Sequence, residues 1–68
     1  MIAFGDHFHF MAKDVEYIIA QKRNRTPDPY EITVCFHSGH TISISYMNKE
    51  EWQFERAELV RKIEQEGL

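Results

Sequence analysis

The sequence predicts a small α+β domain, in which one antiparallel four-stranded sheet, made of two hairpins, carries a C-terminal helix on one face. Three observations lead to this prediction. Short stretches before residue 47 alternate apolar and polar residues, as strands with one buried face do. Isoleucine outnumbers leucine seven to two, and β-branched side chains favour strands over helices. Beyond residue 48, apolar residues instead recur at helical spacing.

The first predicted hairpin begins with Phe8 and Phe10, which alternate with histidines. A turn at residues 11–14 leads into the second strand. We expect Phe10 to lie opposite Val15. The same register places Phe8 opposite Tyr17, so the aromatic side chains gather on one face of the sheet.

The second predicted hairpin depends on the length of its loop. A two-residue loop would put the apolar residues of its two strands on opposite faces. A three-residue loop at residues 37–39 pairs Val34 with Ile42 and collects these residues on one face. It also places Gly39 at the left-handed position of a type I turn with a bulge, where glycine is favoured. We therefore predict the three-residue loop.

The C-terminal helix has a predicted start and end. Asn48 is suited to cap the first turn, with Glu51 three residues later, and Gly67 ends the helix. The apolar stripe that should face the sheet consists of Trp52, Leu59, Val60 and Ile63.

These elements form one domain, residues 1–68, without internal repeats. The hydrophobic pattern of Phe8–Ile18 and Phe36–Ile44 resembles that of small FlbD-type flagellar proteins and small phage-type proteins, and this likeness implies no function. The predicted strands are residues 7–11, 15–22, 30–36 and 40–46, and the predicted helix is residues 49–66.

The charge balance and the cysteine content exclude several classes of protein. Eight basic residues against eleven acidic ones give a net charge of −3, whereas nucleic-acid binders are typically basic. No apolar run approaches the roughly 20 residues that span a bilayer, so we expect no membrane association. The N-terminus lacks the pattern of a signal peptide. One cysteine cannot form an internal disulfide, and we expect a cytoplasmic protein.

The sequence offers ligands for a metal but no strong metal motif. Imidazole and thiolate groups suit zinc, yet their spacing here matches no common zinc site. We expect no metal and no cofactor, and the alternative is a zinc-binding domain. The chain has an isolated Cys-x-His, which is a weak catalytic signal, and no glycine-rich phosphate loop. We therefore predict no catalytic residues and no enzyme activity. The candidate ligands for the alternative are His7, His9, Cys35 and His37.

The function that remains is a small non-enzymatic protein-interaction module, an adaptor or small inhibitor of the size and acidity seen in phage-type proteins. We expect a homodimer at micromolar concentrations, because a short chain without disulfides gains stability from a second buried surface. The outer face of the sheet, where the predicted register places Ile18, Cys35 and Ser43, carries few charges, and an edge strand is the alternative contact. The residues predicted to bind a partner are Ile18, Cys35, Ser43 and Phe54.

A third interpretation uses the loop between the two predicted hairpins. Lys22, Arg23 and Arg25 form a basic cluster beside two prolines. Such a cluster suits phosphate groups, and it would make the chain a nucleic-acid accessory protein. The acidic net charge argues against this interpretation.

Overall fold

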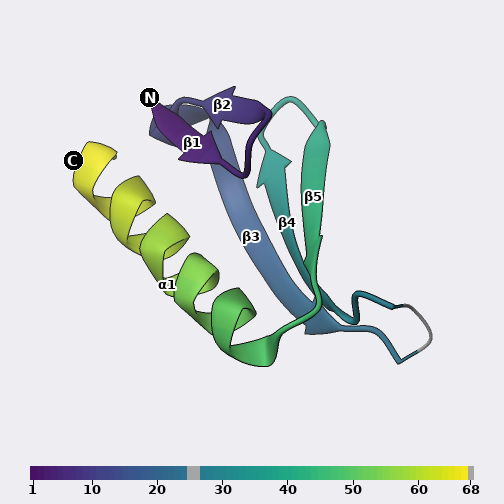
Figure 1. Ribbon diagram of the computed structural model, residues 1–68. Coiled ribbons are helices and arrows are strands. Elements are labelled where there is room, and N and C mark those ends of the chain that lie inside the picture. Colours follow the sequence, from purple (N-terminus) through teal and green to yellow (C-terminus); the bar gives the residue numbers. More distant parts are fainter. Residues whose placement is uncertain (25–26, 68) are drawn as a thin grey trace.

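A three-stranded sheet forms the centre of the computed structural model, which describes residues 1–24 and 27–67, and a helix and a small hairpin cover one face of that sheet (Figure 1). The predicted α+β class and the C-terminal helix on the sheet are confirmed. The prediction of one four-stranded sheet is wrong, because the strands form a sheet of two and a sheet of three. The elements are β1 (Ile2–Phe4), β2 (Phe8–Phe10), the 3₁₀ turn η1 (Ala12–Asp14), β3 (Val15–Lys22), β4 (Tyr30–Phe36), β5 (Thr41–Tyr46) and α1 (Lys49–Glu66).

The two-stranded sheet explains why the predicted first hairpin is wrong. Strand β2 pairs with β1, so Phe8 lies opposite Phe4 and Phe10 opposite Ile2, and neither faces β3. The turn η1 then reverses the chain, with Asp14 N–H donating to Met11 O at 3.0 Å. Because β2 pairs with β1 in a separate sheet, the predicted pairing with Val15 and Tyr17 does not form.

Strand β3 contains an irregularity that reverses the faces predicted for its side chains. Val15 pairs with Phe36 but Tyr17 pairs with Cys35, so Glu16 is an extra residue on β3. A bulge of this kind shifts the alternation of side chains by one position. Ile18 therefore packs against the core, not on the outer face where the sequence predicted it. Tyr17 and Ile19 lie on the outer face instead.

The hairpin of β4 and β5 is confirmed in its register and in its turn. Val34 pairs with Ile42 and Ile32 with Ile44. In the turn, Gly39 has φ +93° and its N–H donates to Phe36 O at 2.9 Å. Ile32 and Val34 are fully buried, because β4 is the central strand and its inner face is covered.

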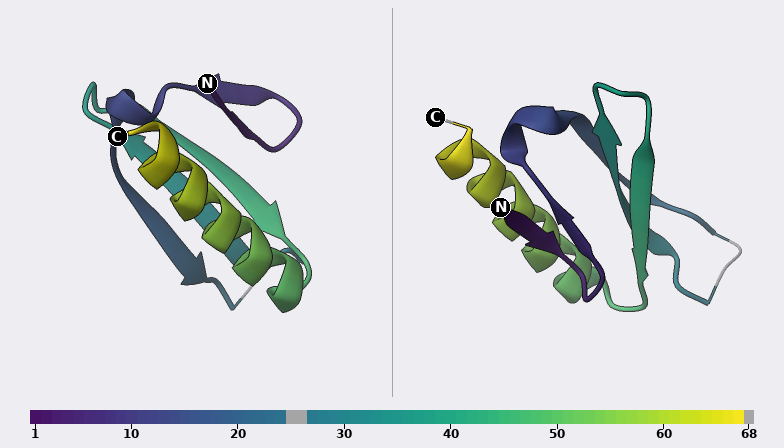
Figure 2. Two further views of the ribbon diagram at one scale, coloured as in Figure 1. Left: turned by 90° about the vertical axis from the view of Figure 1, so that its left-hand side faces the viewer. Right: turned by 90° about the horizontal axis from the view of Figure 1, so that it is seen from above.

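Helix α1 begins and ends where the sequence predicted. The Asn48 side chain accepts hydrogen bonds from the N–H groups of Glu50 at 2.7 Å and Glu51 at 3.4 Å, and Gly67 is the C-cap. Leu59 is the buried residue of the helix, and Trp52 Nε1 donates to the backbone oxygen of Glu31 at 3.1 Å. The helix thus lies across the inner face of the sheet, and the β1–β2 hairpin covers the remainder of that face (Figure 2).

Candidate functional site

The side chains predicted as metal ligands lie on separate elements. His7 is in the turn between β1 and β2, and His9 is on β2. Cys35 is on β4, and His37 is in the turn after it. Within the described ranges, no group of three or more His, Cys, Asp or Glu side chains is placed to hold a metal ion.

The basic cluster predicted for nucleic acid is partly engaged in contacts within the chain. Arg23 forms an ion pair with Glu31, with 3.2 Å between Nη2 and Oε1. The ammonium group of Lys22 lies 5.8 Å from the ring centre of Tyr30, a cation–π distance. Arg25 lies outside the described residues. Two of the three basic side chains therefore already have partners on the sheet.

The outer face of the three-stranded sheet carries two of the predicted partner-binding residues. Ser43 is exposed, and its hydroxyl lies 2.8 Å from that of Thr33 on the neighbouring strand. Cys35 is on the same face but is only 6% exposed. A hydrogen bond between Tyr17 and Cys35 raises the pKa of Tyr17. The thiol is therefore covered by a neighbouring side chain, an environment unlike that of an accessible catalytic cysteine.

Strand β3 has one free edge, and this edge is the most apolar exposed part of the sheet. It pairs with β4 on one side only, and it spans eight residues, or roughly 26 Å. Tyr17 and Ile19 beside this edge are 53% and 40% exposed. Between Tyr17 and Gln21, the strand carries neither the proline nor the charged residues that usually protect an edge.

An apolar groove follows the same edge on the inner side of the sheet. It has a volume of about 210 Å³ and lies between β3 and the C-terminal half of α1. Its apolar walls come from Val15 and Ile18 on β3 and from Val60 and Ile63 on the helix. Apolar side chains are therefore accessible on both sides of the free backbone edge.

Phe54, the fourth residue predicted to bind a partner, lies apart from this edge. Its side chain is 63% exposed on the helix and belongs to no group of core residues. A single exposed aromatic residue is common on protein surfaces. Phe54 therefore adds nothing to the β3 edge.

Sequence reasoning missed the contribution of Tyr17 and Ile19, because it placed them on the buried face. The bulge at Glu16 was the cause, and the sequence does carry a trace of it. Val15 and Ile18, both apolar, are three residues apart instead of two or four. A strand with both residues facing the core needs an extra residue between them.

Tyr46, at the end of β5, is the titratable group whose pKa departs most clearly from its ordinary value among those described. Burial, followed by the negative charges of Glu55 and Glu51, raises its pKa from 10.0 to about 12. The neutral hydroxyl is thus favoured by the folded state. The neutral Tyr46 hydroxyl therefore stabilises the folded state fully below pH 10, and this stabilisation is lost as the pH rises toward 12.

We expect the Tyr46→Phe variant to lose the last tyrosinate component in an absorbance titration at alkaline pH. Ionisation of Tyr46 should lower the free energy of unfolding of the wild type by about 1–2 kcal/mol between pH 10 and 12. The variant has no hydroxyl at this position, so this decrease should be absent from its unfolding free energy. Tyr17→Phe is the control and should keep the component near pH 12. Loss of that component from Tyr17→Phe instead would contradict the assignment.

No helix in the described part of the chain is both long and apolar enough to cross a bilayer. No protein family matches this chain, and no curated protein or solved structure is detectably similar to it.

Proposed function

We propose that this chain is a small non-enzymatic protein-interaction module, and that it forms a homodimer by pairing the β3 strands of two copies. The observation that carries this proposal is the free β3 edge with apolar side chains on both of its sides. Addition of a strand at such an edge supplies main-chain hydrogen bonds, and the flanking side chains supply specificity. Two three-stranded sheets would then become one continuous sheet of six.

The charges on β3 favour a second copy of the same strand as the occupant. In an antiparallel pair centred on Ile19, position 16 of one copy lies opposite position 22 of the other. Glu16 then faces the partner's Lys22 at both ends of the contact, because the pair is symmetric. The same register places Ile18 opposite the partner's Ala20, beside the apolar groove. This alignment brings no like charges together.

The opposite edge of the sheet is less suited to this contact. Strand β5 alternates Ile with Thr and Ser, and it spans six residues. Gly5 in the β1–β2 turn lies against the Ile44 side chain, so the hairpin already packs beside this strand. We therefore assign the dimer contact to β3.

Light scattering at micromolar to millimolar concentrations tests the proposal. The wild type should have the mass of two chains, and Ile19→Lys should have the mass of one, because two lysines would face each other at the centre of the pair. Ser43→Lys is the matched control, since Ser43 is exposed on the same face but lies on β5. A monomeric wild type would overturn the dimer. Dissociation by Ser43→Lys would overturn the edge contact in favour of face-to-face packing.

A charge exchange tests the register. Glu16→Lys and Lys22→Glu should each weaken the dimer, because each variant brings two like charges together at both ends. The double variant E16K/K22E should restore it. Circular dichroism must accompany these measurements, because Lys22 also contacts the Tyr30 ring. A double variant as weak as the single ones would contradict pairing centred on Ile19.

A further inference from the structure

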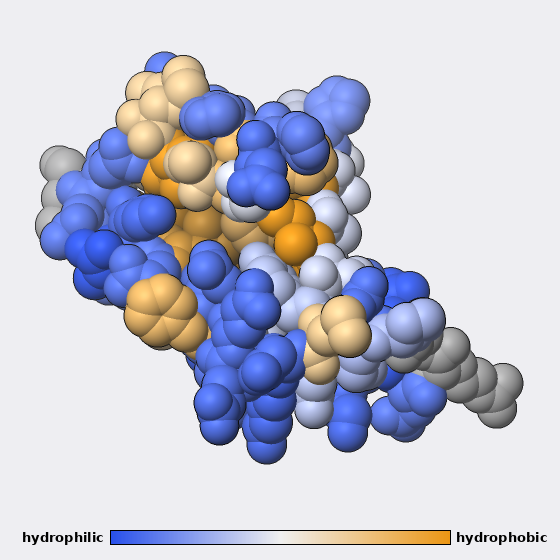
Figure 3. Space-filling model, viewed as in Figure 1, coloured by the Kyte–Doolittle hydropathy of each residue, from blue (hydrophilic) through white to orange (hydrophobic). Residues whose placement is uncertain are grey.

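A second candidate binding region lies on the other side of the molecule from the β3 edge. A cleft of about 420 Å³ opens between the β1–β2 turn, strand β5 and the first turns of α1. Its volume falls within the range of small-ligand pockets. The space-filling view shows a hollow with hydrophobic residues at its floor and hydrophilic residues around it (Figure 3). Ile44 contributes to the apolar part of this lining.

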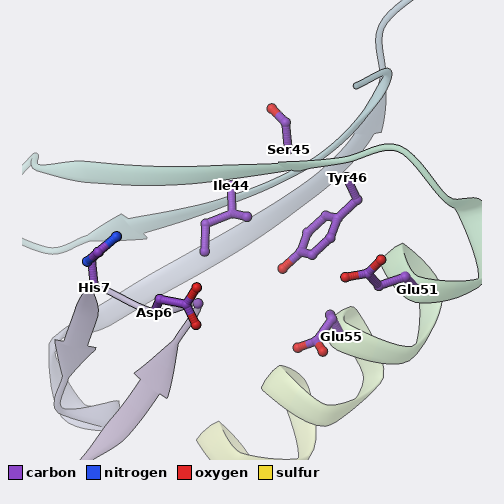
Figure 4. Close-up of a pocket in the computed structure, with 8 residues that line it drawn as sticks. Asp6, His7, Ile44, Ser45, Tyr46, Glu51 and Glu55 are labelled. Atoms are coloured by element: carbon purple, nitrogen blue, oxygen red, sulfur yellow. The ribbon is translucent and has the colours of Figure 1, made fainter. Parts of the chain in front are cut away.

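Three carboxylates line the cleft, and its described lining residues include His7 but no lysine or arginine. Asp6 comes from the β1–β2 turn, and Glu51 and Glu55 come from successive turns of α1 (Figure 4). Among the described residues, Glu31, Glu58 and Glu66 form ion pairs, whereas Asp6, Glu51 and Glu55 form none. The cleft therefore concentrates negative charge that the described chain leaves unneutralised.

The Tyr46 side chain is an independent sign of a ligand. Only 9% of this residue is exposed, and its ring extends from β5 into the cleft, with the hydroxyl directed between Asp6 and Glu55 (Figure 4). The hydroxyl makes no hydrogen bond to the described residues, and its oxygen is not a buried atom, so it is open to the cleft. The buried ring fixes the position of this hydroxyl, which is free to accept an N–H group from a ligand in the cleft. Burial is the main cause of the raised pKa of Tyr46, and the nearby charges of Glu55 and Glu51 raise it further.

The arrangement suits an extended organic cation. The described acidic side chains are not grouped closely enough to hold a metal ion. A guanidinium group is larger and presents five N–H donors in a plane, so it can reach several separate acceptors at once. Ile44 and the Tyr46 ring offer apolar surface to the aliphatic stem of an arginine.

We propose that this cleft binds the guanidinium group of an arginine side chain from a protein partner. Glu51 and Glu55 accept hydrogen bonds from the guanidinium group at one wall, and Asp6 balances its charge from the opposite wall. The Tyr46 hydroxyl accepts a further N–H at the floor. This binding region is separate from the β3 edge, so it does not depend on the dimer.

Nuclear magnetic resonance titration with arginine amide tests the site, and citrulline amide is the neutral control of the same shape. Arginine amide should shift the signals around the cleft, and citrulline amide should not. Lysine amide, which has the charge but lacks the planar donors, should bind at least about threefold more weakly. Glu51→Gln, Glu55→Gln and Tyr46→Phe should each weaken binding of arginine amide by about fivefold. Equal shifts with citrulline amide, or unchanged binding in E51Q/E55Q, would overturn the site.

Two further measurements are needed. The first tests whether the guanidinium group belongs to a protein partner, and the second shows that the cleft and the dimer contact are independent. An acetylated Gly-Arg-Gly amide that binds more tightly than arginine amide supports a protein partner. Equal affinity overturns that source and leaves a free guanidinium compound as the ligand. Equal binding of lysine amide overturns the choice of guanidinium. Light scattering of the same samples keeps the proposals distinct, because E51Q/E55Q should leave the dimer mass unchanged.

Discussion

Replacing Phe4 by alanine is expected to lower the free energy of unfolding by about 3–5 kcal/mol. Phe4 is 3% exposed and contacts Phe10, with ring centres 6.4 Å apart. Phe10 in turn contacts Phe36 on the central strand at 5.4 Å. These edge-on contacts connect the β1–β2 hairpin to the three-stranded sheet, so truncation at Phe4 leaves a cavity at this junction. A domain of this size has a total stability of about 3–10 kcal/mol, so the loss is large.

Phe54→Ala is the matched control, because the substitution is the same and Phe54 is 63% exposed. We expect it to change the free energy of unfolding by less than about 0.5 kcal/mol. Urea unfolding followed by circular dichroism measures both variants. The protein concentration must be equal in all samples, because dimerisation makes the apparent stability depend on it. Similar losses for the two variants would show that the hairpin is not part of the core.

The elements that the sequence predicted correctly are those with local signals. The turn before Gly39 and the alternation on both sides of it define one hairpin register, and a slip by one residue would expose its apolar face. Asn48 at the start of the helix acts through hydrogen bonds to residues two and three positions away. Such features are determined within a few residues, so they can be predicted from the sequence.

The β1–β2 hairpin was missed because β1, a strand of three residues, was not predicted, whereas β2 lies within the predicted strand at residues 7–11. The three residues of β1 are all apolar, so they lack the alternation that indicates a strand. The sequence nevertheless has a symmetric pattern here, since Ile2 and Phe4 mirror Phe8 and Phe10 across the turn. Comparing both sides of Gly5 would have revealed it.

The candidate binding regions depend on tertiary structure to a greater degree. The sequence identified an open edge strand as a possible contact, but the bulge in β3 decided which side chains lie beside it. The cleft could not be predicted. It joins a turn near residue 6 to a strand end near residue 46 and a helix face at residues 51–55. No local pattern links these positions, because the packing of the unpredicted hairpin creates the cleft.

Replacing Gly5 and Gly39 by alanine is expected to separate two contributions to the loss of stability. One is the strained backbone conformation of alanine, and the other is steric overlap with a neighbouring side chain. Both glycines have positive φ, +67° and +93°, so alanine at either position loses about 1 kcal/mol from its backbone conformation. A Cβ at Gly39 would meet no atom within 4 Å, whereas a Cβ at Gly5 would overlap Cδ1 of Ile44. Gly5→Ala should therefore cost about 2–4 kcal/mol, since overpacking adds to the backbone term.

Ile44→Val removes the Cδ1 atom and so tests the source of the additional cost. This substitution alone should cost about 0.5–1.5 kcal/mol. In its background, Gly5→Ala should cost only about 1 kcal/mol, close to the value for Gly39→Ala. Urea unfolding of the two single variants and the double variant gives the coupling energy. A coupling energy near zero would show that Gly5 is needed for its backbone conformation alone, and that the hairpin does not depend on close packing against β5.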